Sequence, residues 1–179
     1  MRLMIKDDKK KFIYYWVLFL IVFFFSWWSN PSLEGRIYPD TWDYIHLAED
    51  LSHSDNTLRP FLYPLIIRLA KFISLDNWSM IVVLIQILFH SISILLIFIL
   101  FQKNKFPIVL NFIFALAIGI NPNLIYWSSA IVPTQLFGCF ILINLFLYLN
   151  YLDEYKNTKN VWNKYFFIFG LFSAFTVTL

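Results

Sequence analysis

The chain has 179 residues, of which 60% are hydrophobic and only 14% are charged, with a net charge of +3 and a mean hydropathy of +0.66. A soluble domain keeps about a quarter of its residues charged, so this composition excludes an ordinary water-soluble protein and indicates a chain built for a lipid bilayer. The small net charge gives no indication of nucleic-acid binding, and the single cysteine, Cys139, excludes an internal disulfide. We therefore expect an all-α, polytopic membrane protein that forms one domain.

The first hydrophobic run covers residues 12–28 and follows a basic tail, residues 1–11, that ends in Lys9-Lys10-Lys11. A helix rises ~1.5 Å per residue, so this run covers about 26 Å and barely spans a hydrocarbon core about 30 Å thick, at the lower limit of the lengths that membrane helices have. The run ends in Trp27-Trp28 without a small-residue cleavage site. This ending favours a retained membrane anchor over a cleaved signal peptide.

A polar segment, residues 29–77, contains two amphipathic stretches. In the first, Asp40 or Thr41 is the expected N-cap, because a side-chain oxygen there accepts a hydrogen bond from an unpaired backbone N–H. Plotted at 100° per residue, its apolar residues share one face: Tyr44, Ile45, Leu47, Ala48 and Leu51. Its polar residues share the other: Asp43, His46, Glu49 and Asp50. We expect this stretch to lie as a helix in the membrane interface.

The second stretch, residues 59–71, begins Arg59-Pro60, and proline is well tolerated in the first turn of a helix. Pro64, Arg68 and Lys71 share one side of this predicted helix, so we expect two cations to point together while the Leu and Ile residues enter lipid. One interfacial helix carrying acids and a second carrying bases would frame an anionic, lipid-linked substrate.

Four more hydrophobic runs follow, at residues 78–101, 106–120, 133–152 and 162–179. They bring the expected total to about five membrane spans. The Asn121-Pro122-Asn123 sequence separates the third span from the fourth. The last run has no closing basic cluster and no polar tail, so we expect the chain to be a truncated or split product of a longer protein.

Polar residues recur on one face of the second run: Ser79, Gln86, His90 and Ser93. Polar groups in hydrocarbon serve either a function or hydrogen bonding between helices. Hydrogen bonding is the commoner use, and no partners for His90 as a metal ligand stand out. Small or polar residues at a spacing of four in the third run predict a close helix contact: Asn111, Ala115 and Gly119.

Lysine and arginine residues indicate the orientation of the chain. If the N-terminus is cytoplasmic and the spans alternate, only four of the 14 Lys and Arg residues face outward: Arg36, Arg59, Arg68 and Lys71. Because positive residues accumulate on the cytoplasmic side, we expect a multi-pass protein of the plasma (inner) membrane with a cytoplasmic N-terminus and residues 29–77 outside.

Two strings in the first external segment carry a family resemblance: Asp40-Thr41-x-x-Tyr44-Ile45-x-x-Ala48 and Arg59-Pro60-x-x-Tyr63-Pro64. A third runs from Asn121-Pro122 through Tyr126 to Pro133-Thr134-Gln135. Together they resemble the bacterial GT-C glycosyltransferases, such as the aminoarabinose and protein-mannosyl transferases. The resemblance implies transfer of a sugar from a polyprenyl-phosphate carrier to an envelope glycan, lipid or protein acceptor outside the membrane.

The resemblance also implies roles for individual residues. Asp40 matches the family's general base, and Asp43 is a second candidate one helical turn further on. The predicted substrate-binding residues are Arg59, which would grip phosphate bidentately, and Tyr63, Arg68, Lys71 and Gln135. The family usually has Thr-Glu where this chain has Thr134-Gln135, so the shape is kept while the charge is lost. Use of a divalent cation is left open.

Each of these residues also has an alternative interpretation. Asp40 could serve only as a helix cap, Asp43 only as part of a solvated helix face, and Arg68 and Lys71 only to reach lipid headgroups. A metal site built on His46 is a weaker hypothesis than solvated surface.

A non-catalytic component of surface-polysaccharide assembly and an inactive fragment remain alternative functions. No phosphate-binding glycine loop or serine nucleophile motif is present. The expected partners are the lipid-linked donor, the bilayer, and a missing C-terminal part or other envelope-assembly proteins.

Overall fold

The computed structural model describes residues 2–50, 62–103, 106–159 and 164–177. Within these ranges the chain forms eight α-helices: α1 (Arg2–Trp28), α2 (Pro39–Glu49), α3 (Leu62–Ile73), α4 (Trp78–Phe101), α5 (Ile108–Gly119), α6 (Pro122–Ser128), α7 (Thr134–Thr158) and α8 (Lys164–Val177). The described part contains no strand beyond one isolated bridge, so the predicted all-α class is confirmed.

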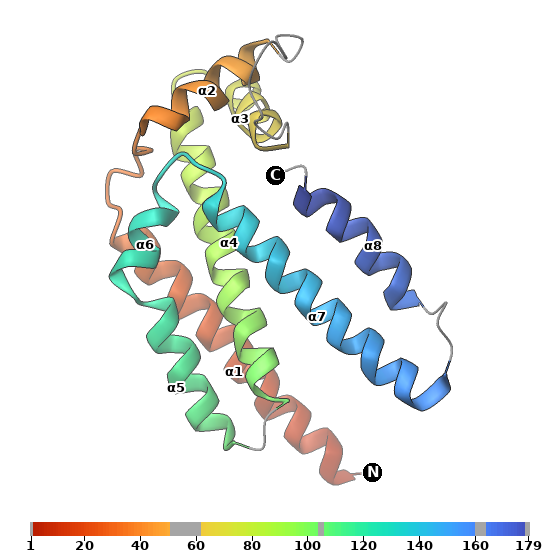
Figure 1. Ribbon diagram of the computed structural model, residues 1–179. Helices are drawn as coiled ribbons and strands as arrows, with labels where there is room; N and C mark the ends of the chain where they lie inside the picture. Colours follow the sequence, from red (N-terminus) through yellow and green to blue (C-terminus); the bar gives the residue numbers. More distant parts are fainter. Residues whose placement is uncertain (1, 51–61, 104–105, 160–163, 178–179) are drawn as a thin grey trace.

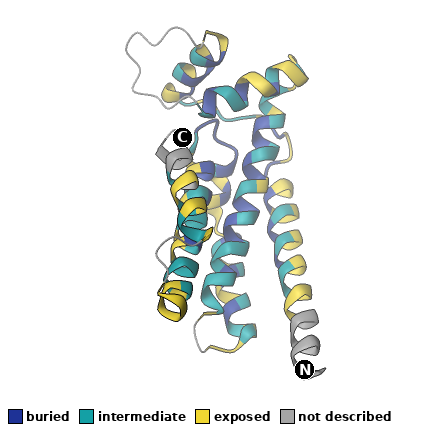
Figure 2. Ribbon diagram, turned by 90° about the vertical axis from the view of Figure 1, so that its right-hand side faces the viewer, coloured by how far each residue is buried: buried dark blue, intermediate teal, exposed yellow. Residues whose placement is uncertain are grey.

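Helix α4 is the central element of the bundle (Figure 1). It packs against α1, α5 and α7 along its length and against α3 and α6 towards its start, while α8 lies along α7. Helices α2 and α3 pack on each other at one end of the bundle, and we call this pair the cap. The buried residues concentrate on α4 and on the faces turned towards it, whereas the outer faces of α1 and α8 are exposed (Figure 2).

Three helical segments are long and apolar enough to cross a membrane: Lys11–Trp28, Trp78–Phe101 and Thr134–Thr158. The pair α5 and α6 makes a fourth if it is counted as one broken span, bent by 56°. Large apolar side chains face outward on these helices, including Phe12, which is 59% exposed, and Trp16, which is 52% exposed. Lipid is the solvent that such surfaces require. The chain is therefore a helical membrane protein with three or four candidate spans.

The remaining predicted span, residues 162–179, is described as α8 over 14 residues. This is shorter than the ~20 residues that usually cross the hydrocarbon core, and α8 is not among the candidate spans of the described chain. A fifth span thus stays a prediction.

The break between α5 and α6 follows from the local sequence. Pro122 has no backbone N–H and keeps Asn121 in an extended conformation, with φ −62° and ψ 122°. The Asn121 side chain then accepts a hydrogen bond from the backbone N–H of Asn123 at 3.0 Å, which caps the new helix. The predicted interruption is confirmed, and it turns the chain before the loop that leads to α7.

The predicted close contact of α5 is also present. Asn111, Ala115 and Gly119 are all buried. A Cβ added to Gly119 would lie 2.6 Å from Val22 Cγ2 and 3.1 Å from Ile94 Cγ2, so only glycine allows α5 to approach both α1 and α4 here. His90 of α4 meets the same turn, since its Nε2 lies 3.0 Å from the Gly119 carbonyl oxygen. His90 therefore joins two helices, as the polar stripe predicted.

Candidate functional site

Two segments far apart in sequence are joined by main-chain hydrogen bonds beside the cap. The Arg36 N–H donates to the Ser129 carbonyl at 2.8 Å, and the Ile131 N–H donates to the Arg36 carbonyl at 3.0 Å. Thr41 Oγ1 then donates to the Ile131 carbonyl at 3.0 Å across 90 residues of sequence. Backbone bonds of this kind fix the position of the start of α2 relative to the loop between α6 and α7.

The start of α2 differs from the prediction. The N-cap is Tyr38, two residues before Asp40, and Pro39 occupies the first helical position. Thr41 Oγ1 accepts a 2.9 Å hydrogen bond from the Tyr38 N–H, which closes the first turn. The assignment of Asp40 or Thr41 as N-cap was therefore wrong, because proline starts a helix more readily than the following residues do. Asp40 lies inside the first turn, where the positive end of the helix dipole attracts negative charge.

A cleft of about 490 Å³ opens between these two segments. It is lined by residues from α2 and its N-cap and from the α6–α7 region: Tyr38, Pro39, Asp40, Tyr44, Trp127, Val132, Pro133 and Thr134. Asp40 is the one charged group among these described lining residues, and its side chain is exposed. The cleft therefore presents one carboxylate within a largely apolar and aromatic wall.

Aromatic rings form one wall of the cleft. Tyr38 stacks on Trp127 with ring centroids 5.4 Å apart and an interplanar angle of 27°. The Tyr38 hydroxyl donates a hydrogen bond to the Tyr126 hydroxyl, and this bond raises the pKa of Tyr38. The Arg36 guanidinium lies over the Tyr126 ring, 4.0 Å from its centroid. Tyr38 and Trp127 thus line the cleft together with Asp40, and Tyr126, with Arg36 over its ring, adjoins Tyr38.

Gln86 of α4 holds the loop that contributes Val132 to the cleft. Its Nε2 donates to the Ala130 carbonyl at 2.8 Å and to the Val132 carbonyl at 2.7 Å, and it lies 3.1 Å from the Tyr63 hydroxyl. Gln86 is fully buried, so these bonds form away from water and hold the loop firmly. The predicted polar stripe on this helix therefore positions one wall of the cleft.

Of the predicted site residues that the structure describes, Asp40 alone lines the cleft. Asp43 is half-buried one turn further along α2 and is not among the described lining residues. Tyr63 is 0% exposed and packs edge-on against Tyr44, with ring centroids 5.2 Å apart. Burial raises its pKa well above the usual value for tyrosine. Arg59 lies outside the described residues.

Three further predicted residues lie away from the lining. Arg68 is exposed on α3. Lys71 forms a 2.6 Å ion pair with Glu49 and lies over the Trp78 ring, 5.3 Å from its centroid. Gln135 is buried just after Thr134, and its Nε2 donates to the Leu124 carbonyl at 2.9 Å.

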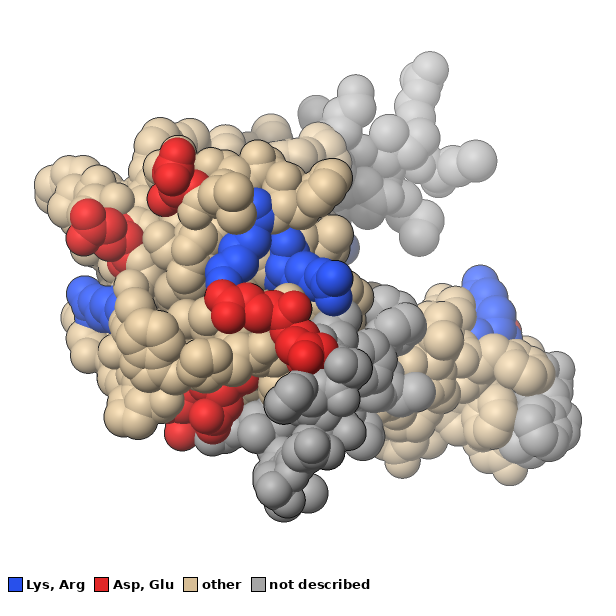
Figure 3. Space-filling view, turned by 90° about the horizontal axis from the view of Figure 1, so that it is seen from above, with Lys and Arg blue, Asp and Glu red and all other residues tan. Residues whose placement is uncertain are grey.

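In the cap, acids of α2 and bases of α3 face one another, and Lys71 reaches across to Glu49. On the predicted cationic side of α3, Pro64 is buried and Arg68 is exposed. Viewed from this end of the molecule, acidic and basic side chains lie against one another (Figure 3). The positive charge of Lys71, which was predicted to face a substrate, is instead paired with the carboxylate of Glu49 within the cap.

Sequence patterns gave no indication that Tyr38 and Trp127 share a site, whereas Gln86 was singled out only as part of the polar stripe of its helix. Tyr38 and Trp127 carry no motif of their own, and contacts between the two segments, including the backbone bonds of Arg36, bring them together. The described residues contain no group of three or more His, Cys, Asp or Glu side chains placed to hold a metal ion.

No family model, curated protein or solved structure matches this chain. The chemistry of the cleft is therefore the basis for a functional proposal.

Proposed function

We propose that this chain is a glycosyltransferase, or part of one, that takes a sugar from a polyprenyl-phosphate carrier at the external face of the plasma membrane. One observation carries the proposal. Asp40 and the Pro133-Thr134 segment, which belong to two separate strings that resemble the GT-C enzymes, line the same cleft. Segments joined in this way across the length of the chain are consistent with a shared site.

The proposed chemistry uses Asp40 as a general base. Its carboxylate accepts the proton of an acceptor hydroxyl while that oxygen forms a bond to the anomeric carbon of the sugar. The bond from that carbon to the phosphate oxygen breaks, and its electron pair leaves with the lipid phosphate. A positioned base contributes about 10²–10⁴-fold to such a transfer. The Tyr38 and Trp127 rings offer an apolar surface for the sugar ring.

The position of the site relative to the membrane is part of the proposal. The bias of lysine and arginine favours a cytoplasmic N-terminus. Alternation through α1, α4, the α5–α6 pair and α7 then puts the cap and the α6–α7 loop on the external side together. Apolar side chains of α3 support its contact with lipid, since Phe72 is 88% exposed and Ile73 is 71% exposed. We further propose that α8 belongs to a fifth span.

The decisive experiment measures sugar transfer by membranes that contain the chain. Radiolabelled undecaprenyl-phosphate mannose and undecaprenyl-phosphate aminoarabinose serve as donor probes, and membranes of the same host without the chain give the background. We expect Asp40→Asn to lower transfer by about 10²–10⁴-fold, because the amide cannot accept the proton. The matched variant Asp43→Asn, one turn away on the same helix, is expected to retain most of the rate.

Both variants must reach the membrane fraction at the level of the unmodified chain. Unchanged transfer by Asp40→Asn would remove that residue from the proposed role. No transfer above background by the unmodified chain, with either donor, would contradict the proposal and favour a non-catalytic role in polysaccharide assembly.

A further inference from the structure

The two walls of the cleft are also joined behind the site, by side chains of α3 and α4. Tyr44 of α2 and Val132 of the α6–α7 loop both line the cleft. Tyr63 of α3 and Gln86 of α4 connect them, and both are 0% exposed. Neither is among the described lining residues. We call Tyr63 and Gln86 the brace.

The brace forms a continuous path of short contacts between the walls. The rings of Tyr44 and Tyr63 pack edge-on with their centroids 5.2 Å apart. The Tyr63 hydroxyl lies 3.1 Å from Gln86 Nε2. The same nitrogen donates to the Val132 carbonyl at 2.7 Å and to the Ala130 carbonyl at 2.8 Å. Because an amide nitrogen carries two hydrogens, these three acceptors share them. The position of α2 is thus linked to that of the loop through two fully buried side chains.

The brace holds α2 at a second point. The hydrogen bond from Thr41 to the Ile131 carbonyl ties the start of the helix to the loop. A helix tied only at its start can still pivot, whereas the brace also holds Tyr44, one turn further on. Asp40 and Tyr44 are four residues apart, so they are neighbours on the surface of α2, and both line the cleft. Holding Tyr44 therefore helps to set the direction in which Asp40 faces.

The direction of Asp40 matters for the chemistry proposed above. A general base must lie within about 2.6–3.2 Å of the group whose proton it takes. A displacement of about 1 Å can lower the rate by about 10²-fold. Small movements of α2 relative to the loop are therefore expected to change the rate without any change in the lining residues.

We propose that Tyr63 and Gln86 are positioning residues, which act through Tyr44 and Val132 to set the separation of the cleft walls and so place Asp40. This role in catalysis rests on the proposed function of the cleft. It differs from the predicted contact of Tyr63 with substrate, because the brace lies behind the walls.

The position of α2 relative to the bundle is measured first, without any assay of activity. Spin labels are attached to Trp42→Cys on α2 and Leu145→Cys on α7, two exposed positions, in the full-length chain with a Cys139→Ser background. Double electron–electron resonance in lipid nanodiscs then gives the distribution of distances between the labels. Tyr63→Phe removes the hydroxyl and keeps the ring that packs on Tyr44. We expect it to broaden this distribution or shift its mean by about 1 Å or more, the scale on which a displaced catalytic group loses rate.

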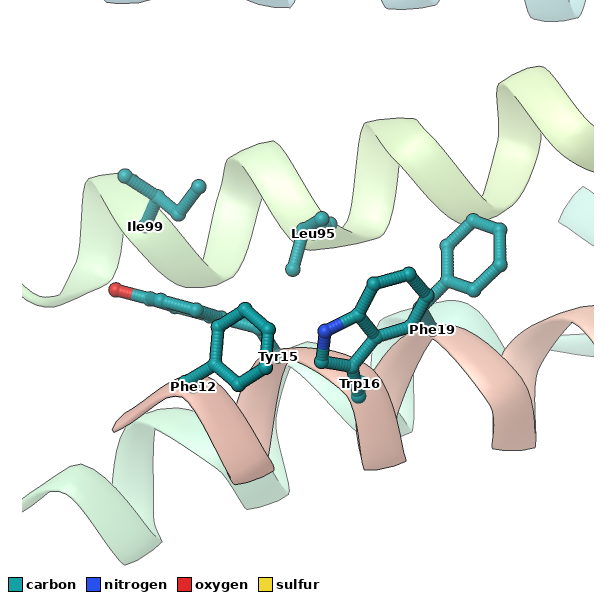
Figure 4. A pocket seen from close by; sticks show the side chains of 6 residues that line it. All are labelled: Phe12, Tyr15, Trp16, Phe19, Leu95 and Ile99. Atoms are coloured by element: carbon teal, nitrogen blue, oxygen red, sulfur yellow. The ribbon is translucent and has the colours of Figure 1, made fainter. Parts of the chain in front are cut away.

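Tyr15→Phe is the matched control. The Tyr15 hydroxyl donates to Gln102 Oε1, also at 3.1 Å, and so joins another tyrosine to another glutamine. Tyr15 lies between α1 and α4 with Phe12 and Leu95, in a groove at the opposite end of the bundle from the cap (Figure 4). We expect Tyr15→Phe to leave the distances and the transfer rate unchanged. An effect as large as that of Tyr63→Phe would indicate general loosening of the bundle and would overturn the proposal.

The second measurement is the rate of sugar transfer per folded chain, with the donor that the unmodified chain uses. We expect Tyr63→Phe to lower kcat about tenfold and to change the KM for the donor by less than about twofold, because a misplaced base weakens the transition state more than it weakens donor binding. Gln86→Leu removes the donor to both loop carbonyls and is expected to lower kcat further. A merely structural role would reduce the amount of folded chain and leave the kcat of the remaining molecules unchanged.

The two measurements distinguish failure of the brace from failure of the proposed function. If the unmodified chain transfers no sugar, the proposed function and the catalytic role of the brace both fail, while the distances still decide whether the brace positions α2. If Tyr63→Phe leaves the distances unchanged, the brace is overturned even in an active chain. If the distances change and kcat does not, Tyr63 serves the fold alone and its role in placing Asp40 is overturned.

Discussion

The proposed role of Asp40 depends more on the residues around it in the fold than on its position in the sequence. A carboxylate near the start of a helix is commonly a cap, but here the N-cap is Tyr38 and Asp40 lies two residues inside the helix. Its exposed side chain consequently lines the cleft with Trp127 and Pro133, which come from the other half of the chain. Because the capping explanation no longer applies, the case for Asp40 as a base rests on the cleft itself.

Two glycines of the membrane helices give a matched test of packing. Gly119→Ala places a methyl group 2.6 Å from Val22 Cγ2, and the short branched valine cannot move aside easily. We expect this change to lower stability by about 1–3 kcal/mol, as over-packing does elsewhere. Gly138 has no atom within 4 Å of an added Cβ. Gly138→Ala is therefore expected to leave stability unchanged or raise it by up to about 1 kcal/mol.

Thermal unfolding in one detergent, followed by the loss of helical circular dichroism, compares the two glycine variants. If Gly119→Ala unfolds at the same temperature as the unmodified chain, the contact of α5 with α1 and α4 is looser than described. A large loss for Gly138→Ala would indicate a contact on α7 that the single chain does not make.

At the scale of the helices, the cap is held by apolar packing and one ion pair. Tyr44 and Ala48 of α2 pack with Tyr63, Ile67 and Ala70 of α3 in one buried cluster. The buried residues of α2 include Tyr44, Ile45 and Ala48 of its predicted apolar face, whereas Leu51 lies outside the described residues. However, the apolar face packs on α3 instead of entering lipid, because a second apolar helix is available beside it.

The ion pair of the cap predicts a pH dependence. The hydrogen bond and charge of Lys71 lower the pKa of Glu49 below its usual value. A lowered pKa in the folded state means that the stabilising contribution is present above the unfolded pKa of about 4.3 and is lost as the pH falls through the lower folded value. Because the pair is exposed, we expect the effect to be small.

The measurement compares the unfolding temperature of the unmodified chain and Glu49→Gln between pH 3 and pH 7. The difference should be present at pH 7 and vanish at the acidic end. Glu34→Gln, at an exposed loop position before α2, is expected to show no such trend. A difference between the unmodified chain and Glu49→Gln that persists at pH 3 would assign the effect to packing instead of charge.

At the scale of the whole molecule, the bundle separates two ends. The cleft and the cap lie at one end, whereas the Lys103–Asp153 ion pair links α4 and α7 at the other. We expect single cysteines to be labelled by a membrane-impermeant maleimide in intact cells at Glu34 and protected at Lys103 and Lys156. The labelling uses a Cys139→Ser background, and disrupted cells should expose all three positions. The reverse pattern would place the cleft in the cytoplasm and exclude the proposed external activity.

Much of the helical architecture could be predicted from the sequence, because each helix depends on local features. Hydrophobic length defined residues 78–101, which match α4 residue for residue, and Pro122 defined the break after α5. The end of α7 could not be found in this way. The hydrophobic run ends near residue 152, but the helix continues through a polar turn to Thr158. In this turn the Thr158 hydroxyl donates a hydrogen bond to the Glu154 carbonyl.

The sequence by itself determined that this chain is a helical membrane protein, because the absence of charge over whole helical lengths leaves lipid as the only suitable solvent. It also singled out Asp40. Only the tertiary structure decided which residues share a site, since Tyr38 meets Trp127 and Gln86 meets Val132 through bonds that no local pattern encodes. By contrast, Tyr63 is buried in the core and Lys71 forms an ion pair with Glu49, and both interactions depend on residues distant in sequence.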